Sequence, residues 1–216
     1  MGRKREFDDD VVINKALMLF WQRGYHALTI DDVLSAIGLA RQSFYNSYSD
    51  KRTLLLRCLG RYRQQVLTNL ETQLASKATP AAGVAAVFEG IAAEPDHHKR
   101  RGCLMISCAS ELAAADIDVA DAAAGFQVAI EDAFAAQLNR GIAELLAANY
   151  PAPPTLDDAR RKARSLTATY FGLRALAKAD LRSTALTDAA RSAADDAARF
   201  LCVPAEEAPA FPLSPS

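Results

Sequence analysis

Residues Thr29–Lys51, TIDDVLSAIGLARQSFYNSYSDK, contain the most informative pattern in this sequence. It begins with Thr29 and has Asp32 three positions later, which is the spacing of a capping box that opens a helix. Gly38 then allows a tight turn, and helical periodicity resumes over 40–47. Two short helices joined by a tight turn predict a helix-turn-helix, whose second helix enters the major groove of DNA.

The second helix of this pair has two chemically different faces. Phe44 and Tyr48 fall on one face and are expected to pack inward, and the polar side chains lie opposite. Arginine can bind guanine through two hydrogen bonds, and glutamine or asparagine can bind adenine in the same way. Tyrosine can reach a phosphate oxygen, and a lysine that opens the next helix adds a cation near the DNA backbone. The candidate DNA-binding residues are Thr29, Arg41, Gln42, Ser43, Tyr45, Asn46 and Lys51.

The rest of the chain also shows helical periodicity, and no segment indicates a strand. The predicted fold class is all-α, with an N-terminal three-helix domain followed by a larger helical domain. The expected helices, about nine in total, cover 8–23, 29–37, 40–47, 50–77, 80–93, 103–114, 118–148, 155–179 and 186–202. The last segment, 203–216, contains four prolines and two glutamates and is expected to be disordered.

Charge is distributed unevenly along the 216 residues. Residues 1–63 carry 11 Lys and Arg against 7 Asp and Glu, whereas residues 64–216 carry 14 against 19, which suggests two parts with different partners. No 18-residue stretch lacks charge and the first residues lack an apolar run, so neither a transmembrane helix nor a signal peptide is expected. The four cysteines form no CxxC pair, and we expect reduced thiols and a cytoplasmic location.

The helix-turn-helix segment and its surroundings resemble the DNA-binding signature of the TetR family of repressors. The resemblance covers about residues 8–60 and rests on the sequence Phe20-Trp21-Gln22-Arg23-Gly24-Tyr25, on Thr29, on the Gly38 turn, on Tyr45 and on Lys51.

Three positions depart from the family pattern. Leu34 stands where Ala is usual, Ala40 where Ser or Thr is usual, and Ser47 where His is usual. We therefore expect that Leu34 must be accommodated between the two helices and that Ala40 leaves the second helix without a side-chain cap.

The resemblance implies a homodimeric repressor that binds a palindrome-like operator and is released by a small-molecule effector. It implies a helix-turn-helix domain over 1–51 and an effector-binding and dimerisation domain over 52–202, followed by the tail over 203–216. The last two helices would form the dimer interface, and their small residues would permit close helix approach. The candidate interface residues are Ala163, Leu166, Tyr170, Leu173, Ala190 and Ala194. The alternative is that this stripe faces the core of its own chain.

The effector is expected to bind in a cavity among the helices of the second domain. The candidate lining residues are Tyr62, Val66, Phe88, Cys103, Met105, Phe126, Ile130 and Phe171. The alternative for each of them is a place in the hydrophobic core. Arg63, Ser107 and Glu111 could supply polar contacts to a ligand or between helices.

Cys103 has a distinct chemical context. It follows the cations of 99–101 and is expected to open a helix, and both features lower the pKa of a thiol. The alternative function is therefore a thiol-based repressor that senses electrophiles or oxidants through Cys103, and the alternative role is a buried, small apolar residue. Because adjacent histidines point apart, we expect no metal site at His97, His98, Cys103 and Cys108, and no cofactor.

Two other classes of function remain as remote alternatives. A helical enzyme would need a catalytic motif, and the sequence contains no GxxxxGK[ST], GxSxG or HExxH. We expect no turnover. A helical interaction module without DNA binding would lack the steep salt dependence that phosphate contacts give to DNA affinity.

Overall fold

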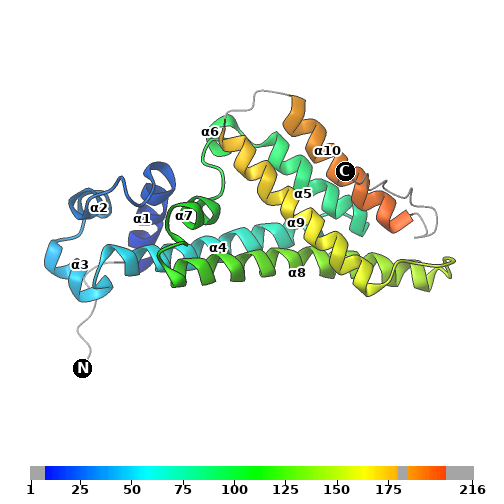
Figure 1. Ribbon diagram of the computed structural model, residues 1–216, viewed down its shortest axis with the longest axis horizontal. Coiled ribbons are helices and arrows are strands. Elements are labelled where there is room, and N and C mark those ends of the chain that lie inside the picture. The colour runs from blue at the N-terminus through cyan, green and yellow to red at the C-terminus, as the bar shows by residue number, and fades with distance from the viewer. Residues whose placement is uncertain (1–7, 180–183, 203–216) are drawn as a thin grey trace, which may run out of the picture.

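The computed structural model describes residues 8–179 and 184–202, and all regular secondary structure in these residues is helical. This confirms the predicted all-α class. Figure 1 shows α1–α3 at one end of an elongated molecule, with α5 and α10 toward the other end. The helices are α1 (Asp9–Arg23), α2 (Ile30–Ile37), α3 (Arg41–Tyr48), α4 (Lys51–Ala75), α5 (Pro80–Ala93), α6 (Asp96–Lys99), α7 (Leu104–Leu112), α8 (Ile117–Ala147), α9 (Leu156–Lys178) and α10 (Thr184–Cys202).

One helix was not expected. The single turn α6 lies in the segment 94–102, which the sequence indicated as a break between helices. The carbonyl oxygen of Pro95 accepts hydrogen bonds from the N–H groups of His98 and Lys99, at 2.8 and 3.1 Å, and these bonds close the turn. The tail 203–216, for which disorder was expected, lies outside the described residues.

The first three helices pack on shared buried side chains, which belong to one hydrophobic core that continues through the rest of the described chain. Helix α1 contributes Phe20 and α3 contributes Phe44 and Tyr48, all of them fully buried. Helix α2 ends at Gly38, whose φ of +76° lies in the left-handed region and whose N–H donates to the Leu34 carbonyl oxygen. This glycine makes the turn between α2 and α3 possible without strain.

Helix α4 runs from the first three helices into the rest of the molecule. Its 25 residues give a rod of roughly 37 Å, and the Asp50 carboxylate caps it by accepting the Thr53 N–H. It packs against α1 at one end and against α5 and α8 along the rest of its length. A structural change along α4 can therefore reach the first three helices as well as α5 and α8.

The helices from α4 to α10 pack side by side around an aromatic core (Figure 1). Phe88 of α5 stacks on Phe134 of α8, with ring centroids 5.8 Å apart. The buried amide of Gln137 donates to the carbonyl oxygens of Leu74 and Pro80, at 2.8 and 3.2 Å, where the chain turns from α4 into α5. None of the helices in the described part of the chain is long and apolar enough to span a membrane.

Candidate nucleic-acid interface

The N-terminus of α2 is held by the predicted capping box. The Thr29 hydroxyl accepts the Asp32 N–H at 3.1 Å, and the Asp32 carboxylate accepts the Thr29 N–H at 2.9 Å. Hydrogen bonds from the Thr29 hydroxyl and amide hold the pKa of the Asp32 carboxyl below its usual value. Thr29 thus fixes the start of the helix-turn-helix, and its proposed contact with DNA stays a prediction.

Helix α3 presents the two faces that the sequence indicated. Phe44 and Tyr48 are fully buried, which confirms that they pack inward. On the other side, Arg41, Gln42 and Asn46 are exposed. Ser43 is half-buried, and Tyr45 keeps 41% of its surface exposed. The polar face is therefore accessible to a DNA groove.

The polar side chains of α3 are already engaged with neighbours. Arg41 forms an ion pair with Asp31 of α2, and the Gln42 side-chain amide donates to the Asn46 side-chain oxygen at 3.1 Å. Exposed ion pairs contribute only about 0–1 kcal/mol, so a base edge or a phosphate can replace these partners at little cost. The internal contacts hold the side chains in place without blocking them.

The structure gives Lys51 a role that the sequence did not indicate. Its ammonium group donates to the carbonyl oxygens of Tyr25 and Leu28, at 3.0 and 2.7 Å, and lies 4.0 Å from the centroid of the Tyr25 ring. Partial burial lowers the pKa of Lys51 below its usual value. An ammonium group has three N–H donors, so one remains for a phosphate oxygen. The predicted contact with the DNA backbone is not tested by this geometry.

The departures from the family pattern have the expected structural effects. Ala40 stands at the N-cap of α3 and provides no side-chain cap. Leu34 is buried in the shared core of the first three helices.

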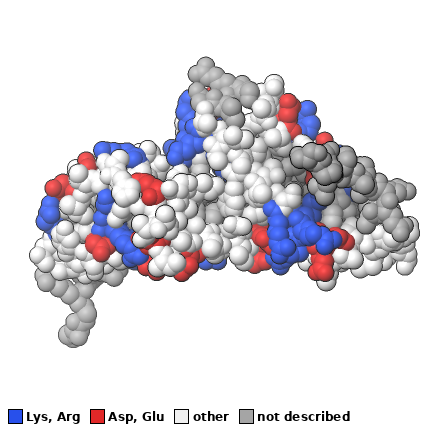
Figure 2. Space-filling view, in the orientation of Figure 1, with Lys and Arg blue, Asp and Glu red and all other residues white. Residues whose placement is uncertain are grey.

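Figure 2 shows lysine and arginine side chains over α1–α3, near α6 and over the lower part of α9, with acidic side chains beside several of them. Several of the arginines on α4 pair with acidic residues. Arg57 and Arg61 pair with Asp9 and Asp10 of α1, and Arg52 donates to Asp116 at 2.5 and 2.7 Å. These pairs link α4 to α1 and to the N-terminus of α8.

Two further contacts join the DNA-binding domain to the rest of the chain. The Glu111 carboxylate of α7 accepts the N–H groups of Tyr25 and His26, at 3.1 and 2.6 Å. The Trp21 indole donates to the Arg101 carbonyl oxygen at 3.0 Å. The sequence indicated Glu111 only as a polar residue near a ligand or between helices, because no local pattern marks a contact over 85 residues.

The candidate effector residues separate into two groups. Tyr62 and Val66 line a cleft of about 390 Å³, and Cys103 lines another of about 430 Å³ beside α1 and α7. The remaining candidates are core residues: Phe88, Met105, Phe126 and Ile130 are almost completely buried, and the half-buried Phe171 packs its ring against Phe126. For this second group the apolar side chains belong to the hydrophobic core, and a role in an effector cavity stays a prediction.

The candidate dimer residues also face inward. All six of them are buried within the single chain: Ala163, Leu166, Tyr170, Leu173, Ala190 and Ala194. Five of the six, all but Ala194, belong to the hydrophobic core of the chain, which favours the alternative, and their role in a dimer interface stays a prediction. The exposed side of α9 carries other small or apolar residues, including Ala168, Gly172 and Leu176.

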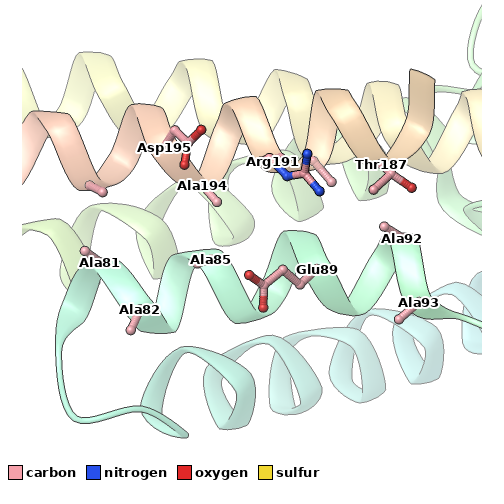
Figure 3. A pocket seen from close by; sticks show the side chains of 12 residues that line it. Ala81, Ala82, Ala85, Glu89, Ala92, Ala93, Thr187, Arg191, Ala194 and Asp195 are labelled. Atoms are coloured by element: carbon pink, nitrogen blue, oxygen red, sulfur yellow. The ribbon is translucent and has the colours of Figure 1, made fainter. Parts of the chain in front are cut away.

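Ala190 and Ala194 of α10 also line a groove at the surface. The groove has a volume of about 610 Å³ and lies between α5 and α10, and its walls are mostly alanine. Figure 3 shows Glu89 of α5 in this groove with Arg191 and Asp195 of α10.

Cys58, Cys103 and Cys108 are buried, and Cys103 is 4% exposed. Burial raises the pKa of the Cys58 and Cys108 thiols to about 12 in each case. Cys103 occupies the N-cap of α7, as expected from its sequence context. Across residues 8–179 and 184–202, no three His, Cys, Asp or Glu side chains are grouped so as to hold a metal ion.

Comparison with known proteins identifies the family. Residues 12–58 match the family described as bacterial regulatory proteins, tetR family. The chain is 31% identical over 135 residues to YezE, an uncharacterised HTH-type transcriptional regulator of Bacillus subtilis (strain 168), and the match covers 62% of this chain and 70% of YezE. It is 30% identical over 122 residues to the HTH-type transcriptional repressor ComR of Escherichia coli (strain K12), covering 56% and 58% of the two chains.

Solved structures share the whole fold. A cysteine mutant of the TetR family transcriptional regulator CifR, complexed with 26-bp operator DNA, is 25% identical with a TM-score of 0.72, over 90% of this chain and 98% of that one. Reduced NemR of E. coli is 18% identical with a TM-score of 0.72, over 91% and 98%. The exposed polar face of α3, the family match and the relatives lead to one conclusion: this chain belongs to the TetR family and is a helix-turn-helix transcriptional regulator.

Proposed function

We propose that this regulator is a repressor that binds a specific operator as a homodimer and leaves it when a small molecule binds. The observation that carries the proposal is the exposed triad of Arg41, Gln42 and Asn46 on α3, above the buried Phe44 and Tyr48. These three side chains are the types that distinguish bases in the major groove. We infer a regulatory rather than a catalytic role, in the cytoplasm.

A homodimer would present two copies of α3 to one face of DNA. Copies about 34–36 Å apart would read two half-sites separated by one helical turn, and the operator would be palindrome-like. The exposed side of α9 supports such an interface, because Ala168 and Gly172 allow another helix to approach closely and Leu176 is 50% exposed. These residues join the six buried ones as interface candidates.

Release by an effector requires two conformations with different affinities for the ligand. The effector must bind the conformation that does not fit the operator more tightly than the one that does. Two contacts could transmit such a change. Glu111 of α7 holds the segment that precedes α2 through the Tyr25 and His26 amides, and Trp21 of α1 binds the Arg101 carbonyl oxygen.

The thiol-sensing alternative remains a separate proposal. It is supported by the position of Cys103 in the wall of a cleft between α1 and α7, where a small electrophile could reach the sulfur after local opening. In this case an electrophile would release the protein from DNA, and the Cys103→Ser variant would stay bound. Equal release of both proteins would exclude Cys103 as the sensor.

Operator binding can be tested by fluorescence anisotropy with DNA that flanks the protein's own gene, or with DNA selected from the genome. Titrations at two salt concentrations, with random DNA as competitor, separate specific from non-specific binding. We expect Gln42→Ala to reduce discrimination by about 1–3 kcal/mol, while Gln64→Ala, an exposed glutamine of α4, has no effect. If both variants kept full discrimination, the assignment of α3 as the reading helix would be wrong.

A further inference from the structure

The cleft that contains Tyr62 lies at the junction of the two domains. We call it the junction cleft; it is lined by residues of α1, α4, α6, α9 and the segments on either side of α6. Its volume of about 390 Å³ falls in the range of pockets that bind small molecules. Six of its lining residues are aromatic or charged side chains that a ligand would contact: Trp21, Tyr62, Glu94, Arg101, Tyr170 and Arg174.

Aromatic rings form one part of the junction cleft. Trp21 and Tyr62 meet edge to face with ring centroids 5.1 Å apart, and Tyr170 lines the cleft from α9. Burial raises the pKa of both tyrosines, so their hydroxyl groups stay protonated and can donate hydrogen bonds. Such walls favour a flat, apolar ring.

The charged part of the junction cleft has an excess of positive charge. Both carboxylate oxygens of Glu94 face the same nitrogen, Nη1 of Arg174, at 2.8 and 3.0 Å. The Nε of Arg174 is buried and has no hydrogen-bond partner. Arg101 lies over the Trp21 ring, 5.8 Å from its centroid, and has no acidic partner among the residues that the structure describes.

A buried donor without an acceptor is rare in folded proteins and requires an explanation. A carboxylate that approaches the Nε–Nη2 edge of a guanidinium forms two parallel hydrogen bonds with it. Glu94 occupies Nη1 and the Tyr170 hydroxyl also interacts with the guanidinium, so a ligand carboxylate would take the Nε–H, which has no acceptor, and compete with Tyr170 for the rest of this edge. Arg101 supplies the charge that Glu94 does not neutralise.

We propose that the junction cleft binds an aromatic carboxylate of one or two rings. The ring packs against Trp21 and Tyr62, and the carboxylate accepts hydrogen bonds from Arg174 and pairs with Arg101. The inference deepens the proposed function, on which it rests for the effect on DNA. The Trp21 indole that forms the wall also donates to the Arg101 carbonyl across the domain junction, so a ligand seated here contacts both domains at once.

The chain itself contains the probe for this experiment, because Trp21 is its only tryptophan. We would titrate the full-length protein with benzoate, 4-chlorobenzoate and 1-naphthoate, following Trp21 fluorescence and, for the dissociation constants, calorimetry. The corresponding amides have the same shape without the charge. We expect saturable binding of at least one carboxylate with a dissociation constant below about 1 mM, and binding of its amide at least about tenfold weaker.

Two variants locate the binding site. Arg174→Gln and Arg101→Gln should each weaken carboxylate binding about ten- to a hundredfold, because each removes a charged donor. Lys99→Gln removes a charge two residues from Arg101 but outside the cleft, and should have no effect. Arg101 is in no ion pair with a described residue, so its variant decides the question if Arg174→Gln does not fold.

The proposal is overturned if no carboxylate binds below about 1 mM, if the amides bind equally well, or if Lys99→Gln weakens binding as much as Arg101→Gln. The same samples are then tested on operator DNA. Carboxylate binding that leaves DNA affinity unchanged supports the ligand class and contradicts effector release. Operator binding without any carboxylate binding leaves the proposed repressor intact and refutes the junction cleft as its site.

Discussion

The Glu111 carboxylate fixes the segment between α1 and α2, and its replacement by glutamine tests how the domains are joined. Glu111 accepts the Tyr25 N–H at 3.1 Å and the His26 N–H at 2.6 Å. A hydrogen bond to a charged group contributes about 1.5–3 kcal/mol to stability. Because the His26 contact is exposed to solvent, we expect a contribution near the lower limit of this range. Glutamine keeps the length of the side chain but removes the charge and one acceptor oxygen. We expect Glu111→Gln to lower the free energy of local opening by about 2 kcal/mol.

Native-state hydrogen exchange measures this quantity at single amides. A loss of about 2 kcal/mol accelerates the exchange of the Tyr25 and His26 amides about thirtyfold, whereas amides in the middle of α8 should be unaffected. Glu144→Gln is the matched control, because Glu144 pairs on the surface with Arg140 four residues away. Unchanged exchange at both amides in Glu111→Gln, or the same acceleration in the control, would refute the role of this carboxylate.

Three other variants probe packing, ionisation and the domain boundary. A Cβ at Gly83 would lie 2.2 Å from the Leu74 carbonyl oxygen, so Gly83→Ala should lower the unfolding free energy by about 3 kcal/mol in chemical denaturation, while Gly60→Ala, with open space, should not. The pKa of Cys58 is raised to about 12, so the stability gained from keeping this thiol protonated is present below pH 9 and is lost as the pH rises toward 12. Between pH 9 and 12 the unfolding free energy of Cys58→Ala should therefore fall less steeply with pH than that of the unmodified protein, by about 1.4 kcal/mol per pH unit. Thermal melts at increasing pH measure this difference. Lys51→Met removes two hydrogen bonds to backbone carbonyls and should lower the unfolding free energy by about 1–3 kcal/mol; an unchanged melting curve would assign Lys51 to DNA alone.

The features that could be predicted from the sequence are those that neighbouring residues encode. The capping box of Thr29 and Asp32 and the turn at Gly38 depend on groups within a few positions of one another, and the structure contains both. The division of α3 into a buried and an exposed face follows from helical spacing alone, so Phe44 and Tyr48 were placed correctly. The single turn α6 was missed because four residues are too few to show a periodic pattern.

Other features depend on contacts between distant segments. Helix α9 carries small and apolar residues on both sides, so its sequence does not show whether Ala163 and Leu166 or Ala168 and Gly172 face the core. An apolar residue in a cavity wall has the same spacing as one in the core, which is why the sequence could not show that Phe88 is completely buried in the core. The junction cleft is recognisable only after α1, α4 and α9 have been brought together.

The recognition helix α3 depends on its surroundings for its order. It has eight residues, far fewer than the roughly 12–15 at which an isolated helix becomes even marginally stable in water, and Ala40 leaves its first amides without a side-chain acceptor. Its anchors are the buried rings of Phe44 and Tyr48. A phosphate oxygen at these amides would supply the missing acceptor and would also meet the positive end of the helix dipole. Part of the affinity for any DNA would then be free energy gained by completing the protein's own secondary structure, and base recognition would begin on a helix already made more rigid by the DNA backbone.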